Sequence, residues 1–203
     1  MRRVSRRLLV ACLVALGAVV PLVPASALEP ETARNFIVGL AEETTAVLTG
    51  DMSDGERQER VITLLNEGFD LPFIGRLVLG PTYRSLTPEQ QQAYTAAFER
   101  FVLATYGRRF EDYNGQEIVV LDAQPEGQQD VRVRSQIRGG GQPTLTIDWR
   151  VRERDGEMRI IDVGVEGVSM AISQRSEFNA VVQRQGIDGL IALLNDRASA
   201  APS

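Results

Sequence analysis

Two segments in the second half of the chain alternate strictly between apolar and polar side chains. They cover residues 131–138 and 144–152. A period of two predicts strands with one apolar face and one wet face. Apolar runs over residues 117–123 and 158–165 predict two further strands. The turns between these segments are short and rich in Gly, so the natural topology is a four-stranded antiparallel meander.

Apolar residues at helical spacing precede this sheet. They predict a helix that begins at Pro30 and ends at Gly50. Asp54 is the candidate N-cap of a second helix, and a short apolar element over residues 73–79 ends at Gly80. The chain therefore begins its folded part with helices rather than with strands.

The clearest helix start is a predicted capping box. Thr87 occupies the N-cap, Pro88 the N1 position and Gln90 the N3 position. The helix that follows carries a stripe of aromatic residues and is predicted to end at Asn114–Gly115.

A final helical region follows the sheet over residues 170–194, with a break near Gly186. Helices, then a meander, then a helix predict an α+β fold. In this fold a curved four-stranded antiparallel sheet is covered on its apolar face by helices. We expect one domain over residues 28–197 and a flexible tail over residues 198–203.

The first 27 residues are typical of a secretory signal peptide. An Arg-rich start and the apolar run Leu8–Val20 precede the small residues Ala25–Ala27, which form a cleavage site. The run is shorter than the about 20 residues that a transmembrane helix needs. Cleavage there removes four Arg and the single Cys12, and it changes the formal net charge from −5 to −9. Ser5–Leu9 resembles a twin-arginine signal, so general secretory and twin-arginine export both stay open. Export in either way predicts a periplasmic protein.

The composition excludes several kinds of active site. The chain has no His, and all 22 of its basic residues are Arg. There is accordingly no His general base, no Ser-His-Asp triad, no His metal ligand and no P-loop lysine. No calcium-loop motif is present either, and the acidic net charge disfavours nucleic acid as a partner. We expect no cofactor.

Two carboxylates lie in neighbouring predicted strands. Asp148 and Asp162 alternate with apolar neighbours, so both are expected on the wet face of the sheet. The same face carries Arg132, Arg134, Arg138, Arg150 and Arg152. This pattern predicts cross-strand Arg–Asp pairs rather than a catalytic pair.

Three blocks of sequence together resemble a known family. The first runs from Phe69 to Ile74, continues at residues 78–80 and extends over residues 83–90; the second covers residues 98–115; the third is residues 160–169 with Arg175 and Phe178. In order and spacing they are similar to the MlaC, or toluene-tolerance Ttg2, family of periplasmic phospholipid-binding proteins.

The resemblance implies a carrier and not an enzyme, with a fold like the NTF2-like cone. Such a carrier holds a phospholipid with its acyl chains inward. It moves the lipid between an inner-membrane ABC transporter complex, with its MCE-type substrate-binding subunit, and an outer-membrane lipoprotein–porin complex, which maintains outer-membrane lipid asymmetry. The residues expected to bind the lipid are Phe73, Ile74, Tyr83, Phe98, Val102, Tyr106, Ile147, Trp149, Val151, Ile161, Val163, Val165, Val168 and Met170.

Two other classes of function stay open on the sequence. An NTF2-like enzyme acting on an apolar small molecule requires an Asp or Glu that points into the pocket. A periplasmic interaction module without a ligand requires a filled core.

Overall fold

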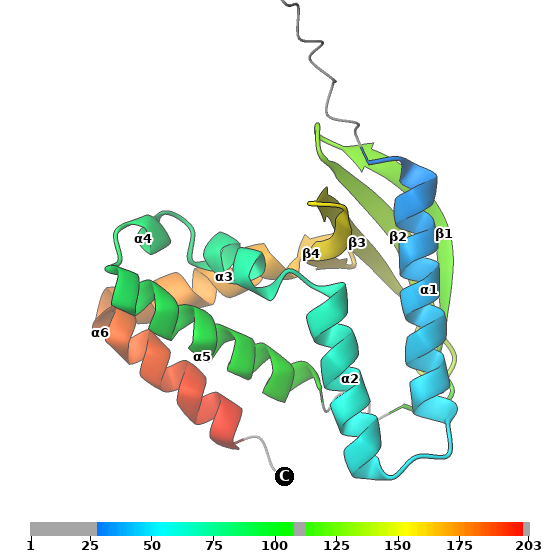
Figure 1. The fold of residues 1–203 in the computed structure, drawn as a ribbon, viewed down its shortest axis with the longest axis horizontal. Helices are drawn as coiled ribbons and strands as arrows, with labels where there is room; N and C mark the ends of the chain where they lie inside the picture. The colour runs from blue at the N-terminus through cyan, green and yellow to red at the C-terminus, as the bar shows by residue number, and fades with distance from the viewer. Residues whose placement is uncertain (1–27, 108–112, 201–203) are drawn as a thin grey trace, which may run out of the picture.

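The computed structural model of the chain describes residues 28–107 and 113–200. The predicted signal peptide and Phe110 of the aromatic stripe lie outside these ranges. Within them, helices pack beside one twisted antiparallel sheet (Figure 1). No helix of the described part is long and apolar enough to cross a membrane.

The sheet is an antiparallel meander, as the short turns predict. Its strands are β1 (Glu117–Glu126), β2 (Asp130–Arg138), β3 (Leu145–Arg154), β4 (Glu157–Val165) and β5 (Val168–Ser169). They lie side by side in chain order, each antiparallel to the next. The α+β class is confirmed, with a fifth strand in addition to the four predicted. Two residues are too few to show an alternation, so β5 leaves no pattern in the sequence.

The described residues form six helices beside the sheet. They are α1 (Pro30–Thr49), α2 (Asp54–Gly68), α3 (Leu71–Leu79), α4 (Pro81–Arg84), α5 (Pro88–Tyr106) and α6 (Met170–Ala200). The helix α5 ends at Tyr106, earlier than the predicted end at Asn114–Gly115, and Tyr113 lies outside any helix. The helix α6 is interrupted at Gly186, whose φ of 70° is left-handed. It continues to Ala200, so the first three residues of the predicted tail are helical.

Capping boxes begin two of these helices. Thr87 caps α5 as predicted, with its hydroxyl accepting from the Gln90 amide at 3.3 Å. The prediction for α2 is wrong by one residue, because Ser53 and not Asp54 is the N-cap. Ser53 has Glu56 at its N3 position, and the pair completes a reciprocal box that Asp54 has no partner to form. The hydrogen bonds from Ser53, first from its hydroxyl, hold the pKa of Glu56 below 4.5.

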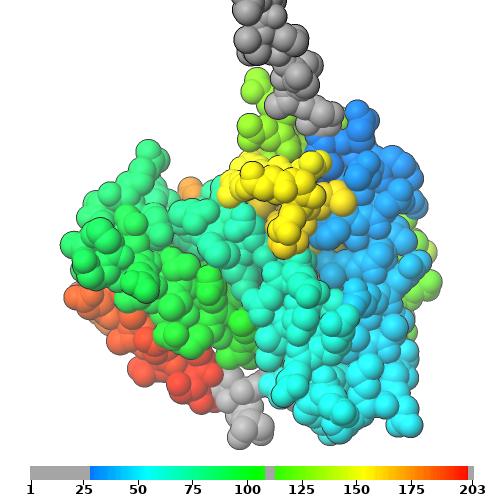
Figure 2. Space-filling model, in the orientation of Figure 1, coloured from blue at the N-terminus to red at the C-terminus, as the bar shows by residue number. Residues whose placement is uncertain are grey.

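The apolar interior is divided between two main cores. One lies between α1 and the sheet, where Ala33 and Ile37 pack on Val131, Val133 and Val151. The other lies among the helices α3, α5 and α6. In the space-filling view α2, in cyan, lies between α1 and α5 and joins them in one continuous surface on this side (Figure 2).

Candidate functional site

A largely apolar cavity of about 350 Å³ lies between the sheet and the helices α3 and α5. Its walls come from the end of α2, from α3 and α5, from β3 and β4, and from the first turn of α6. The predicted site residues that line it are Ile74, Phe98, Val102, Tyr106, Trp149, Val163, Val165 and Met170. The arrangement places aromatic and aliphatic side chains around a space that no side chain of the described residues fills.

The other predicted site residues lie elsewhere. Val151 is fully buried in the core under α1, and Ile147 is buried outside the cavity lining. Tyr83 packs edge-on against Tyr94 in the helical core. Val168 is 57% exposed on β5.

Ile161 misses the cavity because of a β-bulge. The register between β3 and β4 shifts between Arg150 and Val151, which pair with Asp162 and Ile160 respectively. Ile161 is the extra residue, and its side chain is buried at 2% exposure without lining the cavity. A bulge breaks the strict alternation from which this position was predicted.

Phe73 lies on the outer face of α3 and not in the cavity. Its ring is covered by guanidinium groups, with Arg152 at 5.0 Å and Arg154 at 5.5 Å from the ring centre. Leu71, Ile74 and Val78 line the cavity instead. These three follow i, i+3, i+7 spacing, so a helical projection of this segment separates them from Phe73.

The structure adds lining residues that sequence reasoning missed. They are Leu65, Phe69, Leu71, Val78, Phe101, Asp162, Ala171 and Gln174. The helical spacing of α3 and α5 contains the signal for Leu71, Val78 and Phe101. No pattern in the sequence indicates that the end of α2 meets the start of α6 around one space.

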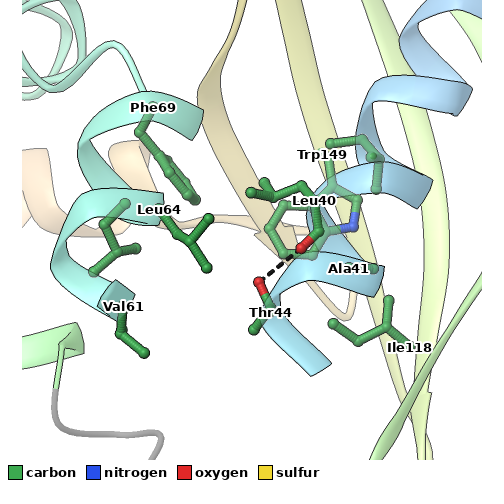
Figure 3. Close-up of a pocket in the computed structure, with 10 residues that line it drawn as sticks. Leu40, Ala41, Thr44, Val61, Leu64, Phe69, Ile118 and Trp149 are labelled. Carbon is green, nitrogen blue, oxygen red and sulfur yellow. Dashed lines mark hydrogen bonds between the residues drawn. The ribbon is translucent and has the colours of Figure 1, made fainter. Parts of the chain in front are cut away.

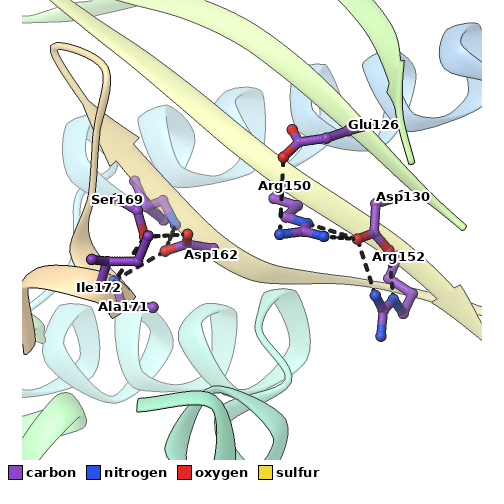
Figure 4. A network of polar contacts seen from close by, with 9 residues as sticks. Glu126, Asp130, Arg150, Arg152, Asp162, Ser169, Ala171 and Ile172 are labelled. Atoms are coloured by element: carbon purple, nitrogen blue, oxygen red, sulfur yellow. Dashed lines mark hydrogen bonds and ion pairs between the residues drawn. The ribbon is translucent and has the colours of Figure 1, made fainter. Parts of the chain in front are cut away.

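Asp162 corrects an expectation about the wet face of the sheet. It was expected to point away from any cavity and to pair with Arg, yet it forms part of the lining. Its carboxylate accepts from the Ser169 hydroxyl at 2.5 Å, the Ala171 amide at 3.1 Å and the Val163 amide at 2.8 Å (Figure 4). These bonds fix the start of α6 against β4 and occupy the carboxylate.

Elsewhere on the wet face the predicted cross-strand Arg–Asp pairs form in part, because Arg132 and Arg138 donate to Gln124 and Gln136 and not to a carboxylate. Arg134 donates to Asp148 at 2.8 Å, and this hydrogen bond raises the pKa of the Arg134 guanidinium. Asp130 is the centre of a second pairing, because its buried carboxylate accepts from Arg150 at 2.6 Å and from Arg152 at 3.0 Å (Figure 4). These contacts join β2 to β3.

A smaller apolar cavity of about 100 Å³ adjoins the first (Figure 3). It lies between α1 and α2, with Ala41 and Leu64 among its lining. Leu65, Phe69 and Trp149 line both cavities. The Trp149 ring is held in place by its indole N–H, which donates to the Ser135 hydroxyl at 2.8 Å.

The chemistry available in the larger cavity is that of an apolar container. Among the lining residues that the structure describes, Asp162 is the charged one, and its carboxylate already accepts hydrogen bonds. No cluster of acidic, His or Cys side chains in residues 28–107 and 113–200 has the arrangement of a metal site. Arg175 donates to the Leu77 carbonyl at 3.1 Å and joins α6 to α3.

The chain is similar to several known proteins. The family model described as MlaC protein matches residues 39–196. The intermembrane phospholipid transport system binding protein MlaC of Haemophilus influenzae is 28% identical over 134 residues, which cover 64% of this chain and 63% of that protein. The match thus spans less than two thirds of that relative's length.

Two further proteins extend the comparison. The toluene tolerance protein ttg2D of Pseudomonas putida is 25% identical over 159 residues, 73% of this chain and 74% of that protein. A solved phospholipid-binding protein from Ralstonia solanacearum, in complex with a phospholipid, has a TM-score of 0.72 at 22% identity. The match covers 83% of this chain and 98% of the solved chain. This structural likeness supports the α+β fold.

Proposed function

The chain belongs to the MlaC family, and on that premise we propose that it is a phospholipid carrier. It binds a phospholipid with acyl chain inside the apolar cavity and headgroup toward solvent. The observation that carries the proposal is the cavity of about 350 Å³ between α3, α5 and β4, lined almost wholly by apolar side chains.

The energetics of the lipid make such a cavity useful. Each acyl methylene gains roughly 0.8 kcal/mol on leaving water, so two ordinary chains amount to on the order of 20 kcal/mol. A free phospholipid therefore does not cross an aqueous space unaided. A protein that shields the chains lowers this barrier without covalent chemistry, and the absence of His and Lys costs it nothing.

The carrier is proposed to work in the periplasm. It exchanges phospholipid with an inner-membrane ABC transporter complex, through its MCE-type subunit, and with an outer-membrane lipoprotein–porin complex, so that outer-membrane lipid asymmetry is maintained. The names of the relatives support this, since one is an intermembrane phospholipid transport system binding protein. The predicted signal peptide supports export.

The two alternatives are less well supported by the geometry. An enzyme of this shape needs a free acid or base in the cavity, whereas Asp162 is engaged with two backbone amides and the Ser169 hydroxyl. An interaction module needs a filled core, whereas the side chains of residues 28–107 and 113–200 leave about 350 Å³ between α3, α5 and β4 unfilled.

The proposal is tested by organic extraction and mass spectrometry of the protein purified without detergent. We expect phospholipid in a stoichiometric amount, because the buried chains dissociate slowly into water. Preparations that repeatedly yield no phospholipid, and that take up none from added vesicles, would overturn the carrier function.

A further inference from the structure

The two apolar cavities are separated by a wall of three shared lining residues, and their volumes differ by more than a factor of three. The wall consists of Leu65, Phe69 and Trp149, which line both spaces. Figure 3 shows Phe69 on the α2 side and Trp149 on the sheet side of the smaller cavity. Each of these side chains contacts whatever occupies either space.

The volumes can be compared with an acyl chain. A group the size of a water molecule or a methylene takes roughly 30 Å³ of liquid volume. On this measure the larger cavity, about 350 Å³, holds about a dozen methylenes, and the smaller one, about 100 Å³, holds about three. Together the two volumes hold about as many carbons as one chain of common membrane length, whereas the larger cavity alone holds fewer.

The smaller cavity is also chemically suited to the end of a chain. Leu40, Ala41, Val61 and Leu64 are among its lining, and its polar member Thr44 donates its hydroxyl proton to the Leu40 carbonyl at 2.7 Å. An ordered water needs several polar partners, and this lining offers few. It therefore offers a methyl end a dry space without a polar group to desolvate.

We propose that the smaller cavity receives the terminal carbons of one acyl chain, and that Leu65, Phe69 and Trp149 determine the chain length the protein prefers. This inference rests on the proposed carrier function and deepens it. The chain enters through the larger cavity, and its end passes between Phe69 and Trp149 to lie between α1 and α2. Chains too short to reach the wall leave the smaller cavity empty.

The test fills the smaller cavity from one side. Ala41→Phe places a ring in it, and Ala46→Phe puts the same ring on the exposed side of the same helix as a control. The probes are lysophosphatidylethanolamines with a decanoyl or a palmitoyl chain, and binding is followed by the fluorescence of Trp149.

Each methylene excluded from an apolar site costs about a fourfold loss in affinity, so excluding three costs ~50-fold. We expect Ala41→Phe to lower palmitoyl affinity by about this factor and decanoyl affinity by less than twofold. Ala46→Phe should change neither.

A second variant of opposite effect protects the test against misfolding of the first. Leu64→Ala enlarges the smaller cavity, so it should raise the affinity for a stearoyl chain relative to a palmitoyl chain. The inference is overturned if every variant that folds keeps the chain-length preference of the unaltered protein. Failure of the carrier function looks different, because then the unaltered protein binds neither probe.

Discussion

Replacing Val163 by Trp should fill part of the larger cavity. Val163 lies on β4 directly opposite Trp149 in the sheet register and lines the cavity. The indole adds about seven non-hydrogen atoms to the side chain. If half of them take positions that acyl methylenes otherwise occupy, three to four methylenes are displaced at about 0.8 kcal/mol each. Phospholipid binding should therefore weaken by about 3 kcal/mol, or ~100-fold.

The assay compares phospholipid retained per protein after parallel detergent-free purification, together with affinity for added phospholipid. Leu121→Trp is the matched control, because Leu121 is 41% exposed on β1 and lies outside both cavities. Val151→Trp provides a contrast, since this residue is fully buried in the core under α1. It should cost about 1–3 kcal/mol of stability through overpacking. A folded Val163→Trp protein that retains as much phospholipid as the control would refute the assignment of the cavity.

Three further changes test how the scaffold holds the site. Glu56→Gln should remove a pH-dependent part of the stability. Because the pKa of Glu56 is lowered in the folded protein, its contribution is complete above pH 4.5 and is lost as the pH falls through the folded-state pKa. Acid unfolding of the two proteins should therefore differ only above the folded-state pKa. Tyr94→Phe removes a buried hydrogen bond of 2.9 Å to the Gly75 carbonyl and should cost about 1–3 kcal/mol in urea unfolding; an unchanged midpoint would contradict the role given to this bond. Asp162→Ala removes the acceptor at the start of α6 and should cost about 1–2 kcal/mol, seen as faster amide exchange in the first turn of that helix; unchanged exchange would show that other contacts hold it.

Local patterns were sufficient for most elements of the fold. The alternation in β2 and β3 reflects one buried face and one wet face, which a strand shows directly in its sequence. The Thr87 capping box likewise states where α5 begins. In α2, two adjacent residues suit the N-cap, and Glu56 at the correct spacing from Ser53 decides between them.

The site was harder to predict, because it depends on which elements meet. The apolar face of the sheet serves two purposes: α1 covers Val151, whereas Trp149 and Val163 on the same face reach the cavity. Alternation cannot distinguish these positions, since both are apolar and face the same side. The bulge at Ile161 is a second reason, because an inserted residue changes the facing of a strand without a clear signature in the sequence.

The central claim is that an acyl chain lies in the apolar interior, and Trp149 can report on it directly. It is the one Trp of the chain, and it lines both cavities. Protein freed of lipid is titrated with phospholipid brominated on the acyl chain, and separately with phospholipid brominated on the headgroup. The account predicts strong, saturable quenching of Trp149 by the chain-brominated lipid and little by the headgroup-brominated lipid. Binding of the chain-brominated lipid without quenching would contradict it.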